Sequence, residues 1–294
     1  LLKNNYKNFF LLILLSAIWG SAFFAIKIGV ENIHPFSVTS IRLLIGSIFL
    51  LFIFNFKNLK IIKNYNILLK IFLIGLIGNF IPFTLINWSE IYIKSNTAGL
   101  LLSVGPILTL TFSHFFTSDD KFTKIKFISI TVGLIGVLFI FGIDNNFVSA
   151  SNFLPKISII IAALGYVISS ILAYNLKKIN PITLTTFVTI FAAIMSLPFM
   201  IFIELQQPSN FETKSLFSVL YLGIFPTAIA FLIRFYIIAN AGPIFLSYVA
   251  YLIPVFAIIW GYLFLGETVN LTTSIGVFLV LAGVFISQKN LIYK

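Results

Sequence analysis

The feature that most constrains this chain is a succession of ten apolar runs, each roughly twenty residues long, between Phe9 and Ser287. A helix crosses the bilayer core, about 30 Å thick, with about 20 apolar residues. Because the core offers no water to the peptide groups, only helices and closed barrels can span it. The runs are continuous, whereas barrel strands alternate apolar and polar residues. The sequence therefore predicts an all-α membrane protein with ten transmembrane helices.

The composition leaves little room for a further domain, since 60% of the residues are hydrophobic and only 9% are charged. The first run is longer than the apolar region of a signal peptide, about 7–15 residues, and we expect it to be retained as the first helix. Any binding site must then lie between helices. The predicted helices cover residues 9–30, 35–55, 67–88, 96–117, 123–143, 155–176, 181–203, 216–239, 243–265 and 270–288.

The net charge of +11 follows the predicted membrane topology rather than a basic face for nucleic acid. Twelve lysines fall on one side of the predicted membrane and three on the other. Cytoplasmic loops of membrane proteins carry such an excess. We therefore expect a bacterial inner-membrane protein with both termini in the cytoplasm, in contact with lipid and with no nucleic-acid partner. The twelve are Lys3, Lys7, Lys57, Lys60, Lys63, Lys121, Lys124, Lys126, Lys177, Lys178, Lys289 and Lys294, and the three are Lys94, Lys156 and Lys214.

The two halves of the chain, 1–147 and 148–294, resemble each other. Residues 75–119 align with residues 223–267 at a constant offset of 148. Each half holds five predicted helices, and an odd number inserts the second half upside down. Inverted repeats are typical of secondary transporters, whose substrate binds near the midplane between the repeats. The alternative is a duplicated scaffold or accessory subunit that transports nothing. The matched pairs include Gly20 with Gly165, Pro35 with Pro181, Gly75 with Gly223, Phe83 with Phe231, Pro106 with Pro254, and Asp119 with Glu267.

These features together resemble the EamA family of the drug/metabolite transporter superfamily. The resemblance covers essentially the whole chain as two five-helix units. It rests on Trp19-Gly20, on Arg42-Leu43, on the helices of Pro106 and Pro254 with an acidic residue thirteen positions later, and on the Gly-rich closing helices. One departure is Ser118-Asp119, where the family usually has Gly-Glu, as in Gly266-Glu267. The resemblance implies a central cavity lined by both halves and the movement of small metabolites such as amino acids or their relatives.

Two arginines lie within predicted helices, where an insertion cost of about 2.5–3.5 kcal/mol demands an explanation. Arg234 shares a helix face with Thr227 and Phe231. It is a cavity cation that meets an anionic group of the solute, a donor to a backbone carbonyl of another helix, or a side chain at a shallow position near the cytoplasmic end of its helix. Arg42 matches a family position, but the second helix of this family usually lies outside the cavity. We expect a structural or gating role for Arg42, and helix kinks or breaks at Pro106 and Pro254.

Polar and aromatic side chains recur at helical spacing in other predicted helices. With Trp19 they form a candidate cavity that stacks on an organic solute and bonds its polar groups. Trp88 and Tyr92 fit better in the aromatic belt at the membrane surface. The predicted substrate-binding residues are Trp19, Asn79, Phe83, Asn87, Tyr166, Thr227, Phe231, Arg234, Tyr248 and Tyr251.

Enzyme and metal chemistry lack a recognisable basis in this sequence. It has no cysteine, no P-loop and no His-Glu-x-x-His motif, so we expect no catalytic residue, metal or cofactor. No carboxylate lies deep in a predicted helix, and Glu90 and His114 lie near helix ends. We therefore expect a secondary transporter without an obligatory proton, which exports or exchanges a small polar metabolite by alternating access as a monomer or homodimer.

Overall fold

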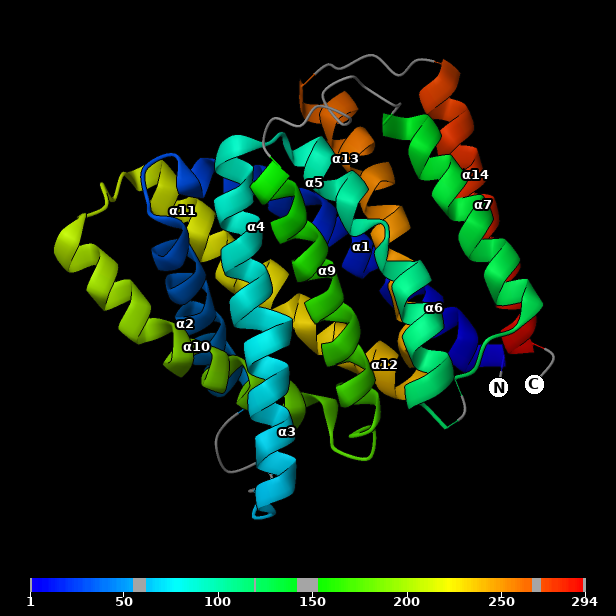
Figure 1. Cartoon of the computed structure of the whole chain (residues 1–294), viewed down its shortest axis with the longest axis horizontal. Coiled ribbons are helices and arrows are strands. Elements are labelled where there is room, and N and C mark those ends of the chain that lie inside the picture. The colour runs from blue at the N-terminus through cyan, green and yellow to red at the C-terminus, as the bar shows by residue number, and fades with distance from the viewer. Residues whose placement is uncertain (1, 55–61, 119, 142–152, 266–270, 293–294) are drawn as a thin grey trace.

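The computed structural model describes residues 2–54, 62–118, 120–141, 153–265 and 271–292, and these residues form helices joined by short connections (Figure 1). The first half comprises α1 (Leu2–Val30), α2 (Pro35–Phe54), α3 (Tyr65–Gly75), η2 (Leu76–Phe80), α4 (Ile81–Tyr92), α5 (Ser95–Leu102), α6 (Gly105–Phe116) and α7 (Lys124–Phe141). The second half comprises α9 (Phe153–Tyr174), α10 (Pro181–Gln206), α11 (Thr213–Leu222), η3 (Gly223–Ile229), α12 (Ala230–Ser247), α13 (Val249–Leu265) and α14 (Leu271–Ile292).

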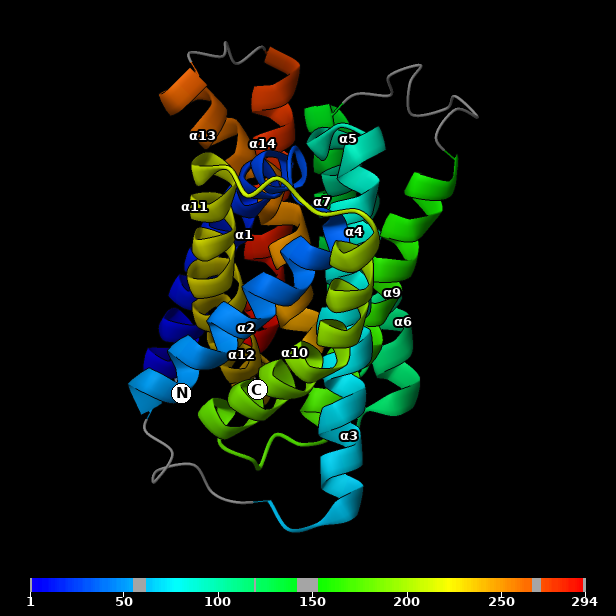
Figure 2. The ribbon, with the colours of Figure 1, turned by 90° about the vertical axis from the view of Figure 1, so that its left-hand side faces the viewer.

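The two halves run in opposite directions through one helical bundle. In Figure 1, α1 begins at the lower end of the bundle, whereas α9, the first helix of the second half, begins at the upper end. The start of α1 and the end of α14 lie at the same end, as both views show (Figures 1 and 2). The all-helical fold with two inverted repeats is therefore confirmed.

The surface of the bundle suits a lipid environment. Large apolar side chains point outward on several helices, including Phe52 on α2, which is 86% exposed, and Phe278 on α14, which is 71% exposed. Within the described residues, seven helical spans are long and apolar enough to cross a membrane, and Leu271–Ile286 is a shorter apolar helix. The total of ten crossings stays a prediction. The predicted boundary between residues 147 and 148, and the residues Asp119 and Glu267, lie outside the described residues.

Both halves contain a stretch of π-helix at matching positions. Leu76–Phe80 and Gly223–Ile229 overlap under the offset of 148, although only the second stretch contains a proline, Pro226. In the second stretch, Pro226 has no N–H to donate to the carbonyl of Leu222. The Thr227 hydroxyl donates to that carbonyl instead, at 2.8 Å. Such π-stretches are frequent at functional sites, and here both adjoin the interface of the two halves.

The predicted fourth and ninth helices are both interrupted. The fourth breaks at Ser103–Val104, just before Pro106. The ninth is interrupted at Tyr248, between α12 and α13. It is also preceded by a break at Gly242 within α12, whose φ of 88° and ψ of 165° suit only glycine. The carboxylate of Asp120, from the other half, accepts from the N–H of Ile244 at 2.9 Å and from Lys126 at 2.6 Å. Asp120 thus ties the α6–α7 connection to the break at Gly242 within α12. The predicted disruption at Pro106 is confirmed, whereas α13 continues through Pro254.

Candidate functional site

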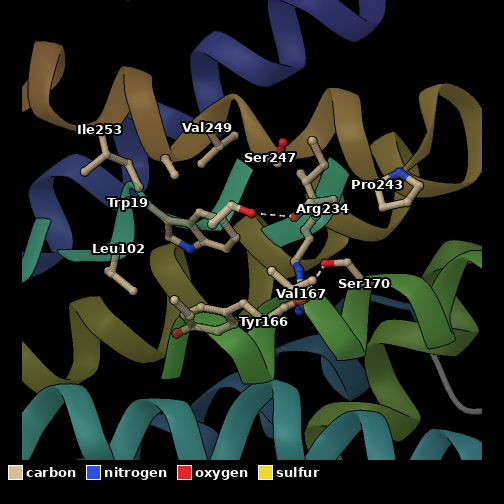
Figure 3. Close-up of a pocket in the computed structure, with 15 residues that line it drawn as sticks. Trp19, Leu102, Tyr166, Val167, Ser170, Arg234, Pro243, Ser247, Val249 and Ile253 are labelled. Carbon is tan, nitrogen blue, oxygen red and sulfur yellow. Dashed lines mark hydrogen bonds between the residues drawn. The ribbon is translucent and has the colours of Figure 1, made fainter. Parts of the chain in front are cut away.

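A cavity of about 100 Å³ lies between the two halves (Figure 3). Six helices supply its wall, namely α1, α5, α6, α9, α12 and α13. Figure 3 shows the rings of Trp19 and Tyr166 next to each other, with the Arg234 side chain reaching toward Ser170 on α9. The lining is otherwise largely apolar. A single cation in a mainly apolar cavity is the arrangement expected of a selective site for a small polar solute.

Arg234 is 1% exposed and is held in place entirely by neutral groups. Its Nη2 donates to the Tyr166 carbonyl at 3.1 Å and to the hydroxyls of Ser169 and Ser170 at 2.7 and 2.9 Å. Its Nη1 is buried and has no hydrogen-bond partner. No carboxylate among the described residues forms an ion pair with it. Because an unpaired buried charge is costly, we expect the Arg234 guanidinium to bind an anion.

A second cavity of about 70 Å³ adjoins the first. The two share Trp19, Leu102, Tyr166 and Ile253 in their walls. Arg42 lies in the wall of the second cavity, together with Phe83 and Ile86. The expectation that Arg42 stands outside the cavity was therefore wrong. Its helix, α2, approaches η3 closely enough that a Cβ on Gly223 would lie 2.6 Å from Ile45, and this close packing brings α2 inward.

The two arginines flank a pair of phenylalanines that occupy matching positions in the two halves. The Arg42 guanidinium lies over the Phe83 ring, 3.8 Å from its centroid. The Phe83 and Phe231 rings meet edge to face with centroids 5.5 Å apart. The Arg234 guanidinium lies 5.0 Å from the Phe231 centroid. Arg42, Phe83, Phe231 and Arg234 thus form a row, which we call the Arg–Phe row. Aromatic faces attract cations, so the row holds both guanidinium groups without a carboxylate.

The remaining contacts hold the row in register. Arg42 donates from Nε to the Thr227 hydroxyl at 3.0 Å. The Trp19 indole donates to the carbonyl of Pro226 at 3.1 Å, and its ring meets Phe231 edge to face. Thr227 and Phe231 were expected to line the cavity beside Arg234. The structure instead places Thr227 against Arg42, and it buries Phe231 in the Arg–Phe row.

The structure brings some predicted residues together and separates others. Trp19, Tyr166 and Arg234 line the larger cavity, and Phe83 lines the smaller one. Asn79 lies in η2 with both amide atoms buried and unbonded. Asn87 donates to Thr39 at 2.9 Å. Neither asparagine is part of either cavity wall.

Tyr248 and Tyr251 turn toward α7 rather than toward the cavities. The Tyr248 hydroxyl lies 2.5 Å from that of Ser129, and the Tyr251 ring fills the space where a Cβ on Gly133 would lie. The residues that face the cavity from this region are Pro243, Leu246, Ser247, Val249, Ala250 and Ile253. Most of them are apolar, so a search for polar residues at helical spacing singles out only Ser247 among them. The sequence signal that could have found them is Gly242, the position of the break that sets their orientation.

Glu90 lies deeper than its place near a helix end suggested. It is 0% exposed, its Oε2 accepts from Ser95 at 3.2 Å, and its Oε1 has no partner. Lys27 donates to the backbone carbonyl of Glu90 at 2.5 Å. His114, by contrast, is exposed beside Phe115 and Phe122. Trp88 contacts Tyr92 edge to face, away from both cavities.

A family model describes the relation of this chain to known proteins. The model of the EamA-like transporter family matches residues 7–142 and again residues 153–288. This chain belongs to the EamA-like transporter family. The resemblance seen in the sequence is thereby confirmed, and the chain is a multi-pass membrane protein of a transporter family.

Individual relatives are similar to this chain over nearly its full length. The uncharacterised transporter YoaV of Bacillus subtilis is 25% identical, with 94% of each chain covered. An uncharacterised transporter of Archaeoglobus fulgidus is 29% identical over 95% of this chain and 98% of its own. A solved crystal structure superimposes with a TM-score of 0.77 at 18% identity, covering 98% of this chain and 97% of that one. That structure supports the fold alone.

Proposed function

We propose that this protein is a secondary transporter that moves a small polar metabolite with an anionic group, such as an amino acid or related compound, by alternating access. The observation that carries the proposal is Arg234, a buried guanidinium at the cavity between the two halves with one nitrogen unpaired. A carboxylate accepts two parallel hydrogen bonds from a guanidinium. The inverted repeats supply two related halves that can rock about a site at their interface. Export or exchange is the expected direction.

The same cavity weighs against a scaffold or accessory subunit that transports nothing. A scaffold would need only close packing between the halves. This interface encloses two cavities instead, and each has a guanidinium in its wall. Buried charge at a packed interface is costly and brings a scaffold no advantage. Binding and transport of a charged solute would account for the two buried arginines.

The proposal is tested by uptake into proteoliposomes loaded with the purified protein. We expect uptake from a panel of amino acids and small carboxylic acids, and less uptake of the uncharged amide of each active compound. Empty liposomes give the passive leak. Equal uptake of acids and their amides would contradict selection by Arg234, and no uptake of any compound above the leak would favour the scaffold.

The proposed orientation places both termini in the cytoplasm of a cell whose inner membrane holds the protein. The E. coli relative YedA, 28% identical over 86% of this chain, is named an inner membrane transporter. Because the chain has no cysteine, single cysteines can report sidedness. We expect an impermeant thiol reagent added outside intact cells to label Glu267→Cys and to spare Asp119→Cys. The reverse pattern would overturn the orientation.

The proposed transport follows the solute gradient and needs no proton. Glu90 is the residue best placed to carry a proton if this proposal is wrong. It is fully buried, and it lies one helical turn from Ile86, which lines the smaller cavity. We expect a pH gradient imposed on proteoliposomes, without a solute gradient, to produce no accumulation. Accumulation that disappears in Glu90→Gln would identify a proton-coupled carrier. Accumulation that survives Glu90→Gln and fails in His114→Ala would place the proton site at the other membrane face.

A further inference from the structure

Arg42 is a second buried cation without a described ion-pair partner, and it lies in the wall of a different cavity from Arg234. It is 3% exposed, and its one described hydrogen bond runs from Nε to Thr227. It lines the smaller cavity. Among the described residues, no carboxylate lies within ion-pair distance of it. The proposed function uses Arg234 alone, so it leaves this second buried cation unexplained.

The charged groups around Arg42 do not satisfy it. Glu90 is near enough for its charge to act on Arg42, but not near enough for an ion pair. The described contacts of Glu90 go to Ser95 and Lys27. The described hydrogen bond of the Arg42 side chain uses Nε, and none is described for its two Nη atoms, so the guanidinium fork is available to a ligand in the smaller cavity. Phe83 covers one of its faces, which leaves approach in the plane of the fork, the direction a carboxylate takes.

The two cavities are adjacent, so one small solute can reach both cations. They share Trp19 and Tyr166, whose rings lie next to each other in Figure 3. The successive separations of 3.8, 5.5 and 5.0 Å along the Arg–Phe row set an upper limit to the distance between the two guanidinium carbons. A short chain with an anionic group at each end matches that arrangement.

We propose that the smaller cavity is a second anion subsite, and that the transported solute is a short dianion of the dicarboxylate type. One carboxylate binds Arg234 and the other binds Arg42, while Trp19 and Tyr166 pack against the chain between them. The solute then supplies two negative charges where the protein presents two uncompensated positive ones. Each repeat contributes one of the two arginines, so the dianion joins the halves when both subsites are filled. This inference rests on the proposed function and narrows its substrate class.

The test compares dicarboxylates with monoanions of matched size. Succinate, glutarate and adipate, each paired with its monoamide, are titrated into the purified full-length protein, and the shift in thermal unfolding gives an apparent affinity. We expect at least one diacid to bind about tenfold or more tightly than its monoamide, since a charge-assisted hydrogen bond contributes about that much. In Arg42→Gln the diacid and its monoamide are expected to bind equally. Arg42→Lys is expected to keep part of the preference.

Two controls separate binding from folding. Thr227→Val removes the hydrogen bonds to Arg42 and to the Leu222 carbonyl and keeps the charge of Arg42, so it should retain the preference for the diacid. The unfolding temperature without ligand and the elution volume show whether Arg42→Gln is folded. If that variant is not folded, Arg42→Lys with a reduced diacid preference and an unchanged affinity for the monoamide carries the test.

The outcomes distinguish this inference from the proposed function. No preference for any diacid, or a preference that persists in Arg42→Gln, overturns the second subsite. If monoamide binding is nevertheless lost in Arg234→Gln, the proposed anion site at Arg234 stands by itself. If neither diacids nor monoamides bind, both the second subsite and anion selection at Arg234 fail.

Discussion

Arg234→Leu is expected to abolish solute transport while the protein stays inserted and folded. The variant removes the one cation of the larger cavity, and with it the site for an anionic group. It leaves little unsatisfied behind, because the hydroxyls of Ser169 and Ser170 also donate to the carbonyl of Tyr166, at 3.0 and 2.7 Å. A leucine in place of a buried cation also lowers the cost of insertion by about 2.5–3.5 kcal/mol on insertion scales.

A matched series makes the Arg234 result specific. Arg234→Lys keeps the charge and loses the planar fork, so we expect partial uptake with weaker selection for carboxylates. Ser169→Ala removes one of three bonds to the guanidinium and should reduce uptake only modestly. Uptake and elution volume are measured together in proteoliposomes and detergent. Wild-type uptake by Arg234→Leu would make the arginine a structural donor to α9 and nothing more.

Gly242→Ala is expected to destabilise the protein strongly, because two effects coincide there. The backbone at φ 88° and ψ 165° costs a residue with a side chain about 1–3 kcal/mol. The new Cβ would also lie 2.7 Å from Oδ2 of Asp120, the atom that accepts from Ile244. The contact between the halves at this break would therefore be disrupted. We expect the unfolding temperature in detergent to fall by roughly 2–10 °C.

Gly105→Ala is the matched control for Gly242→Ala. Position 105 begins α6, and no heavy atom lies within 4 Å of a Cβ built there. We expect its unfolding temperature to change little. When Gly242→Ala is combined with Ser247→Cys, we expect the new cysteine in the cavity wall to react faster with a thiol reagent than it does in Ser247→Cys alone. The reagent is added on the side of the membrane nearest to Gly242. Equal unfolding temperatures for the two alanine variants would show that the break tolerates a side chain.

Much of the fold followed from the sequence, since the bilayer sets a strong and simple rule. Apolar runs of the right length became helices, and the short polar breaks became connections. The starts of α2 and α10 at Pro35 and Pro181 coincide with the predicted starts. The lengths of the helices were less predictable. The helix that begins at Thr213 continues through the π-stretch past Pro226 as far as the break at Gly242.

The candidate site was predicted only where an unusual residue marked it. Arg234 stood out because a charge inside a membrane helix is costly, and Trp19 and Tyr166 joined it as large amphipathic rings. Asn79 and Asn87 each lie four residues from Phe83, and they were expected to share its helix face. However, η2 widens the helix at Asn79, so the regular spacing no longer defines one face there.

The sequence by itself determined that this chain is a helical membrane protein of two related halves, because hydrophobic length and the offset of 148 are properties of the sequence alone. The tertiary structure decided which side chains meet at the centre. The rotation of each helix about its axis depends on packing against its neighbours, which the sequence pattern does not specify. That packing turned Tyr251 onto Gly133 and brought Arg42 to Phe83. Two arginines on helices far apart in the chain thereby came to flank one pair of phenylalanines.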